Sequence, residues 1–447
     1  MLRWAGAGAG RRGCPRPLNL LASRASSLGR LRLPPIPRDG GALAARLRRD
    51  GSRGGGALRF GARYGSSDSL PRAPCLPAPG EWDETIGAPA SPGGRPGRAW
   101  YGMGMAEQAM EVRKFVSRGG IRVYGMPVET FPGHVNNIYL IVDGDTLTLV
   151  DVGSGTDDSV KGLHERFDEL RERFGERVSL DDVRHVVITH AHIDHFGWVG
   201  HFTRETGARV WVHELDARVL SRFEERIVLA SKDMRVFLER AGVKSPLRDE
   251  LETMYQFSKA FFKSVTIDGV VKDAQRIING YRVHHTPGHC PGQICLEVDD
   301  LLFTADHVLS RITPHQSPAS ITPFCGLELY LQSLDKVRRL GGISLALPGH
   351  EAPIEDMPAR IGVIAAHHER RLAQVLEFCR DPMNLVEVSQ RLFGPRAGYT
   401  RLLALEEAGA HVEYLFQRGE LGIANLSEVS EQANPVIQYE TRRGAAA

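Results

Sequence analysis

The sequence contains little cysteine, no long apolar run and almost no net charge. Six cysteines at irregular spacing in 447 residues do not make a disulfide framework, so we expect a reducing compartment. The sequence has no run of about 18 apolar residues, and we expect no membrane-spanning helix and no secretory signal. The formal net charge of +2 says little about partners, because the basic excess is local. These absences favour a cytoplasmic protein.

The basic excess lies at the N-terminus, where residues 1–66 carry many arginines against only Asp39 and Asp50. Residues 1–105 are rich in Gly, Pro, Ala and Arg and lack periodicity, which predicts a disordered tail. Three interpretations stay open. The tail is a transit peptide that places the protein in the mitochondrial matrix, a nucleic-acid-binding arm, or a stretch upstream of the true start. We favour the last, with translation beginning at Met103, Met105 or Met110.

Residues 106–362 show the alternation of strands and helices that is typical of a layered α/β domain. Apolar runs at 137–142 and 146–151 predict two strands joined by a hairpin turn. Apolar residues at three-and-four spacing predict an amphipathic helix over 160–174. Residues 215–265 predict a helical insertion, which we interpret either as a lid or as support for the core.

Residues 363–447 are predicted to form a separate helical segment. Three helices and a turn at Arg418-Gly419 resemble a small winged-helix appendage. Its helices are not strongly basic, so we prefer a helical clamp or a homodimer contact to a DNA-reading role.

The most informative stretch is H-x-H-x-D-H, formed by His190, His192, Asp194 and His195 after the apolar run Val186–Ile188. A buried strand that delivers three imidazoles and a carboxylate is hard to explain by packing, because each polar group needs a partner once it is desolvated. A transition metal is a common partner for neutral imidazoles. The stretch therefore predicts metal binding.

Three further candidate ligands follow predicted strands: His289 in T-P-G-H, Asp306 in T-A-D-H, and His350 in P-G-H. A single histidine after a strand is usually a satisfied surface or core residue. Five histidines and two aspartates at strand ends are a stronger coincidence, and together they predict one metal centre.

These motifs, in this order, resemble the metallo-β-lactamase superfamily over about residues 115–365. The resemblance implies an αββα sandwich with its site on the loops at one edge. It implies one metal on His190, His192 and His289 and a second on Asp194, His195 and His350, with Asp306 bridging. It also implies that Asp151 supports the first metal-binding loop.

The resemblance further implies two zinc ions, with iron or manganese as alternatives. A hydroxide shared by two metals could attack an electrophilic carbonyl, and Asp194 could also orient or transfer a proton. The general likeness is to glyoxalase-II-like hydrolases and to lactamase-like proteins with a C-terminal winged helix. We therefore expect a dinuclear hydrolase of a small-molecule ester, thioester or lactone.

Three alternatives stay open. An RNA phosphodiesterase would need a basic groove that the sequence does not reveal, so a nucleic-acid partner is not favoured. A mononuclear iron persulfide dioxygenase has a similar fold but needs only two histidines and one aspartate, which leaves Asp194, His195 and His350 unexplained. A non-catalytic binding module is disfavoured by the complete ligand set.

Other histidines are expected to have smaller roles. We interpret His134 as a plain loop residue near the entrance and His368 as a packing or surface residue. His284 and His285 flank the T-P-G-H motif and face opposite sides of their strand.

Overall fold

The computed structural model describes residues 110–257 and 262–442. The predicted disordered tail, residues 1–105, lies outside this described part of the chain. Within the described part, no helix is both long enough and apolar enough to cross a membrane.

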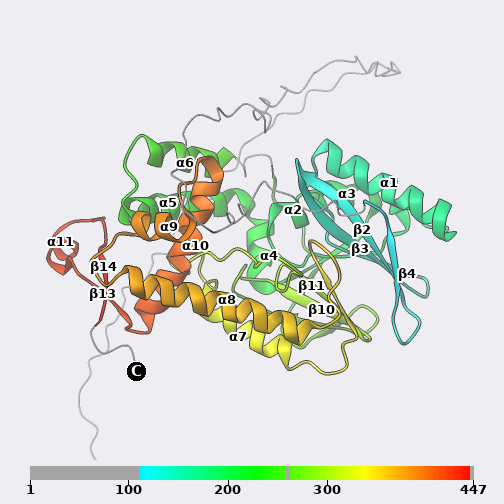
Figure 1. The fold of residues 1–447 in the computed structure, drawn as a ribbon. Coiled ribbons are helices and arrows are strands. Elements are labelled where there is room, and N and C mark those ends of the chain that lie inside the picture. The colour runs from blue at the N-terminus through cyan, green and yellow to red at the C-terminus, as the bar shows by residue number, and fades with distance from the viewer. Residues whose placement is uncertain (1–109, 258–261, 443–447) are drawn as a thin grey trace, which may run out of the picture. The chain divides into compact units, whose positions relative to one another are not determined.

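The larger of the two main sheets has seven strands in chain order. Its N-terminal strands are coloured cyan in Figure 1. Neighbouring strands are antiparallel as far as the fourth and parallel from the fourth to the seventh. The strands are β1 (Arg113–Val116), β2 (Arg122–Phe131), β3 (His134–Asp143), β4 (Thr146–Val150), β5 (His185–Val187), β6 (Arg209–His213) and β7 (Gly269–Val271). The hairpin predicted over 137–151 is confirmed, whereas the sequence pattern does not predict the short, largely exposed β1.

Helical crossovers join the parallel strands of this sheet, as parallel pairing requires. They are α1 (Asp157–Phe174), the 3-10 helix η1 (Leu180–Asp182), α2 (Ile193–Phe196), α3 (Val199–Thr206), α4 (Glu214–Ser221), α5 (Phe223–Ala241) and α6 (Leu247–Phe257). The helix predicted over 160–174 is confirmed as α1, which begins one turn earlier because Thr156 caps it by accepting from the Ser159 N–H. The helical insertion predicted over 215–265 corresponds to α4, α5 and α6.

The second sheet has five strands in the order β12-β11-β10-β9-β8. All neighbours are antiparallel except β11 and β12, which are parallel and joined through a helix. The elements are β8 (Arg276–Ile277), β9 (Tyr281–His285), β10 (Ile294–Val298), β11 (Leu301–Ala305), α7 (Leu327–Arg338) and β12 (Leu345–Pro348).

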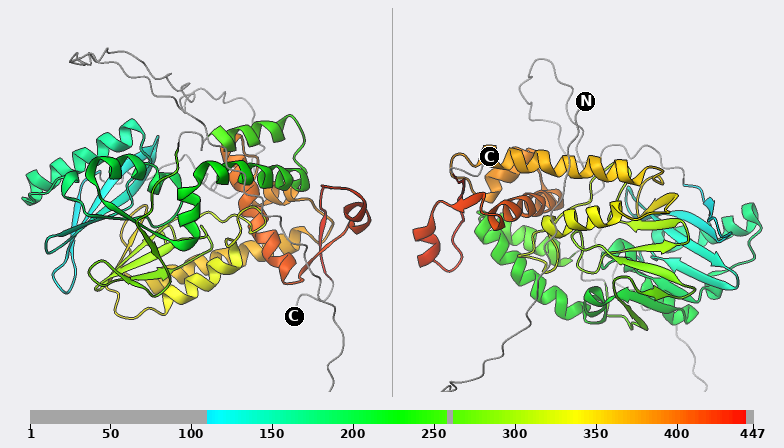
Figure 2. Two further views of the ribbon diagram at one scale, coloured as in Figure 1. Left: turned by 180° about the vertical axis from the view of Figure 1, so that it is seen from behind. Right: turned by 90° about the horizontal axis from the view of Figure 1, so that it is seen from below.

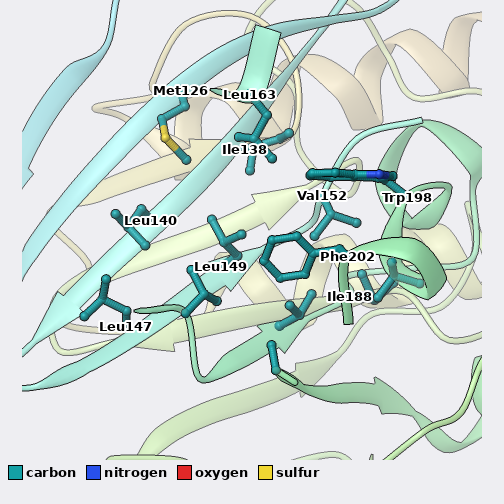
Figure 3. Packing of buried hydrophobic residues seen from close by; sticks show 14 of the residues in the cluster. Met126, Ile138, Leu140, Leu147, Leu149, Val152, Leu163, Ile188, Trp198 and Phe202 are labelled. Carbon is teal, nitrogen blue, oxygen red and sulfur yellow. The ribbon is translucent and has the colours of Figure 1, made fainter. Parts of the chain in front are cut away.

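Three apolar cores stack these elements into an αββα sandwich. Met126, Leu140 and Leu149 of the first sheet pack against Leu163 of α1 and Phe202 of α3 (Figure 3). A second core lies between the sheets, where alternate residues of both face each other. A third core joins the outer face of the second sheet to α7 and to the helix that follows β12. This architecture confirms the predicted fold class.

The C-terminal elements are α8 (Met357–Phe378), α9 (Leu385–Phe393), α10 (Gly398–Gln417), β13 (Leu421–Ile423), α11 (Leu426–Glu431) and β14 (Tyr439–Thr441). A fourth apolar core joins α5 and α6 to α8, α9, α10, β13 and β14, and Figures 1 and 2 show α8 alongside α7. The predicted border at residue 363 falls inside α8. Ile361 and Ile364 of this helix belong to the core under the second sheet, and Val375 belongs to the C-terminal core.

Candidate metal centre

The first three candidate ligands lie close together. His190 and His192 lie in the loop that follows β5, and the Nε2 atom of His190 lies 3.0 Å from the Nδ1 atom of His192. His289, from the loop between β9 and β10, brings its ring within 4.5 Å of the His192 ring, measured between centroids. One nitrogen of each side chain lies within 4.8 Å of the others, so the three could share one metal ion.

Asp194, His195 and His350 form the second set. The helical turn of α2 carries Asp194 and His195, and the Nε2 atom of His195 lies 3.4 Å from Oδ2 of Asp194. His350 follows β12, and its Nε2 atom lies 3.5 Å from the same oxygen. The two sets contain six of the seven ligands that the sequence predicts, and Asp306 is the seventh.

Asp306 lies between the two sets. Its Oδ2 atom is 4.0 Å from Nε2 of His190 and 3.7 Å from Nε2 of His289. The same carboxylate approaches the second set, at 3.5 Å from Nε2 of His195 and 3.3 Å from Nε2 of His350. This position is compatible with a bridging carboxylate.

Asp151 supports the H-x-H-x-D-H loop through both of its oxygens. Oδ1 accepts a hydrogen bond from the backbone N–H of Thr189 at 2.8 Å, and Oδ2 accepts one from the Thr189 hydroxyl at 2.8 Å. Oδ2 also lies 2.8 Å from Nδ1 of His195, so the imidazole donates there and turns Nε2 toward the centre. The supporting role implied by the resemblance agrees with these contacts.

Replacing Asp151 by asparagine should weaken metal binding by about 10–100-fold while leaving the fold intact. The amide cannot accept from the Thr189 N–H, the Thr189 hydroxyl and His195 Nδ1 together, so the loop loses at least one contact. The measurement is a Zn²⁺ titration against a chromophoric chelator. Asp157→Asn, at an exposed position in the first turn of α1, is the control. Equal affinities for the two variants would contradict the assigned role of Asp151.

Two further candidate ligands, His289 and His350, are oriented by hydrogen bonds to backbone carbonyls. Nδ1 of His289 donates to the carbonyl of His315 at 2.7 Å, and Nδ1 of His350 donates to that of Val135 at 2.8 Å. Each bond fixes the tautomer that leaves Nε2 free to face the centre.

The interpretation of His134 as a plain loop residue is wrong. His134 is the first residue of β3, and its Nε2 atom lies 3.1 Å from Oδ2 of Asp194. Its ring lies 4.5 Å from that of His350, and its side chain is 31% exposed, at the margin of the centre. Asn136, two residues later on the same strand face, donates to the same Asp194 oxygen at 3.0 Å.

Asp216 of α4 is a second supporting carboxylate, and the sequence did not single it out. It accepts from the backbone N–H of Ala191, between two ligands, and from that of Gly292, each at 2.8 Å. Burial raises the pKa of Asp216 to about 6. An acidic residue inside the helix-forming stretch after β6 was the one hint in the sequence, but the sequence does not show which backbone groups this residue contacts.

The remaining flanking histidines lie outside the two sets. Nε2 of His284 contacts Glu297 at 2.6 Å, and Nε2 of His285 donates to the carbonyl of Pro291 at 2.8 Å. His368 is buried and packs against His411, which confirms its interpretation as a packing residue.

Backbone geometry around the centre leaves little room for change. A Cβ atom at Gly349 would lie 2.5 Å from Oδ1 of Asp306 and 3.0 Å from Cε1 of His195, so only glycine fits beside the centre. Asp151 and Glu351, which flank site loops, have left-handed φ angles of 62° and 68°. Such conformations cost about 1–3 kcal/mol in non-glycine residues and tend to occur at functional sites.

Electrostatics favours a cation here. Burial lowers the pKa of His190 well below its ordinary value, which keeps that imidazole in the neutral, metal-binding form. Burial opposes ionisation of Asp306, but His350 and His195 hold the pKa of this carboxyl well below its usual range. Burial likewise opposes charge on His350, yet Asp306 and Asp194 raise its pKa to about 10. The buried carboxylates thus need positive charge around them.

The donor set fits a divalent metal. Two buried atoms at the centre, Nε2 of His289 and Oδ1 of Asp306, have no hydrogen-bond partner among the described residues. Leaving such atoms desolvated and unpaired is unfavourable, and neutral imidazoles and carboxylates are the ligands that zinc and related metals take.

Comparison with known proteins also indicates a metal-binding protein. The Metallo-beta-lactamase superfamily sequence model matches residues 132–350. The probable metallo-hydrolase YqjP of Bacillus subtilis is 25% identical over 289 residues, which are 62% of this chain and 87% of that protein. The atrochrysone carboxyl ACP thioesterase of Aspergillus fumigatus is 25% identical over 242 residues, 54% of this chain and 58% of the thioesterase.

Among solved structures, a metallo-beta-lactamase family protein of Thermus thermophilus has a TM-score of 0.58 and 28% identity. The match covers 72% of this chain and 98% of that protein. A beta-lactamase domain protein of Burkholderia ambifaria also has a TM-score of 0.58, with 25% identity over 74% of this chain and 94% of that one. The chain therefore belongs to the metallo-β-lactamase superfamily and is a metal-binding hydrolase with that fold.

Proposed function

We propose that this hydrolase carries two divalent metals, zinc by preference, and cleaves a small ester, thioester or lactone. The position of Asp306 carries the proposal, because one buried carboxylate lies within 4.0 Å of imidazoles of both sets. The first set is His190, His192 and His289, and the second is Asp194, His195 and His350.

Bound divalent metals supply Lewis acidity, which activates water and polarises a carbonyl. Asp194 is the residue that we propose to orient the attacking water and to accept its proton. Burial opposes its ionisation, but His195 and hydrogen bonds from His134 and His350 hold the pKa of Asp194 well below its ordinary value. The Asn136 amide, donating at 3.0 Å, fixes the direction of this carboxylate.

The substrate class rests on the chemistry of the donor set and on the relatives. The matched relatives include a probable metallo-hydrolase and a thioesterase. Thioesters have an electrophilic carbonyl and a good leaving group, so a site that activates water suits them.

The test is the metal content of protein expressed without added metal, paired with turnover of a generic thioester. We expect about two zinc ions per chain, loss of turnover on chelation, and its return when Zn²⁺ is added back. About one iron per chain, with oxygen consumed in the presence of a persulfide, would overturn the proposal. Turnover that survives complete removal of metal would also contradict it.

A further inference from the structure

A segment between β11 and α7 connects the metal centre to the C-terminal helices. We call residues 314–320 the His315 segment. The backbone carbonyl of His315 accepts the Nδ1–H of His289 at 2.7 Å. This bond sets which nitrogen of His289 faces the other candidate ligands, so the position of the carbonyl controls the orientation of one ligand ring. The relevant question is what fixes the carbonyl.

Two carboxylates of α10 hold the His315 side chain. Nε2 of His315 lies 2.9 Å from Oε2 of Glu406, and Nδ1 lies 3.4 Å from Oε2 of Glu407. The same oxygens reach further along the segment: Glu407 accepts from the backbone N–H of Gln316 at 2.7 Å, and Glu406 accepts from the Ser317 hydroxyl at 3.2 Å. Four contacts therefore fix the chain on both sides of the carbonyl.

The carboxylates are themselves anchored inside the protein. Glu406 and Glu407 are only 7% and 6% exposed, so their charges need partners. Arg371 of α8, an obligatory cation, donates to Oε1 of Glu407 at 2.7 Å. Glu407 thus already binds the Arg371 guanidinium and the backbone N–H of Gln316. The nearby group of His368, Glu407 and His411 is therefore better explained as a buried polar network than as a further metal site.

We propose that Glu406 and Glu407 are positioning residues for the metal ligand His289 and that they act through the His315 carbonyl. The inference rests on the proposed function in one respect, namely that His289 binds metal. It assigns to the C-terminal helices a part in building the metal centre, about 90 residues further along the chain than the segment they hold.

The experiment uses the full-length protein, stripped of metal and titrated with Zn²⁺ against a chromophoric chelator. Glu406→Gln and Glu407→Gln should each weaken the binding of one Zn²⁺ by about tenfold or more, as loss of a ligand's outer support does. After substitution with Co²⁺, the visible absorption bands, which report coordination geometry, should also differ from those of the wild type. A residue with only a general stabilising role would lower Tm and leave these bands unchanged.

Glu413→Gln is the matched control. Glu413 lies on the same helix, and its carboxylate accepts from the backbone N–H groups of Ala319 at 2.8 Å and Ser320 at 3.1 Å, farther from the carbonyl. It should alter Tm but keep Zn²⁺ affinity within about twofold of the wild type. If Glu407→Gln removes the ion pair between Arg371 and Glu407 and fails to fold, Glu406→Gln decides the question, because that variant keeps this ion pair.

Two results would overturn the inference, and they are distinguishable. If the wild type binds metal and both variants match Glu413→Gln in Zn²⁺ affinity and Co²⁺ spectrum, the positioning role is refuted while the proposed function stands. If the wild type binds no divalent metal, the proposed function fails and the inference fails with it.

Discussion

Replacing His192 with alanine should abolish both bound metal and turnover. His192 is one of three imidazoles in the first set, with its ring 4.6 Å from that of His190 and 4.5 Å from that of His289. Loss of a direct ligand should cost more than the about 10–100-fold that loss of an outer support costs. The measurements are metal content by elemental analysis and kcat/KM on the same preparation.

His201→Ala is the matched control for that experiment. His201 is an exposed histidine of α3 whose Nε2 atom pairs with Glu205 at 3.1 Å, outside both sets of candidate ligands. It should keep full metal content and full turnover. If His192→Ala loses its metal but still turns over substrate, metal-dependent hydrolysis is refuted for this protein.

Ending the chain after Asp381 should give an unfolded or insoluble product. The truncation removes buried apolar side chains from the C-terminal core, namely Leu385, Val388, Leu402, Leu405, Ala408, Val412, Leu415 and Leu421. Burying each large aliphatic side chain contributes about 1.5–3 kcal/mol, so the seven leucines and valines together contribute about 10–20 kcal/mol, which is as large as the about 5–15 kcal/mol by which proteins are stable. Met234 and Leu238 of α5 would become exposed.

The comparison is with a chain that ends at Arg442, which keeps every described residue. Solubility, the circular dichroism spectrum and Zn²⁺ content distinguish the two proteins. A soluble truncated protein with native metal content would show that residues 110–381 fold alone. In that case the domain border would lie after α8, near residue 381, and not at the predicted residue 363.

The local part of the candidate centre could be predicted from the sequence. His190, His192, Asp194 and His195 lie within six consecutive positions after a strand, so a strand followed by one helical turn brings them together whatever the rest of the fold does. His289, Asp306 and His350 follow strands that end at one edge of a sandwich. The resemblance to the family, and not the local sequence, predicted that these strand ends meet at one edge.

The supports of the centre could not be predicted because they depend on contacts distant in sequence. His134 contacts Asp194, which lies 60 positions further along the chain, because the first residues of β3 lie beside the centre. Asp216 and Glu406 lie on helices, where nothing in an amphipathic pattern distinguishes a buried functional carboxylate from a solvated one. The apolar stripe that predicts α8 runs through residue 363, so the helix itself argues against a flexible boundary there.

The use of backbone carbonyls as acceptors for His289 and His350 has a consequence for mutational tolerance. Any amino acid at position 315 or 135 still presents a carbonyl oxygen, so a saturation scan of those two positions would not remove either acceptor. Asp151 differs, because its support of His195 is a side chain and disappears when that side chain is replaced. Sensitivity to substitution around His289 should therefore depend on the side chains that fix the course of the main chain, and these include the imidazole of His315 itself.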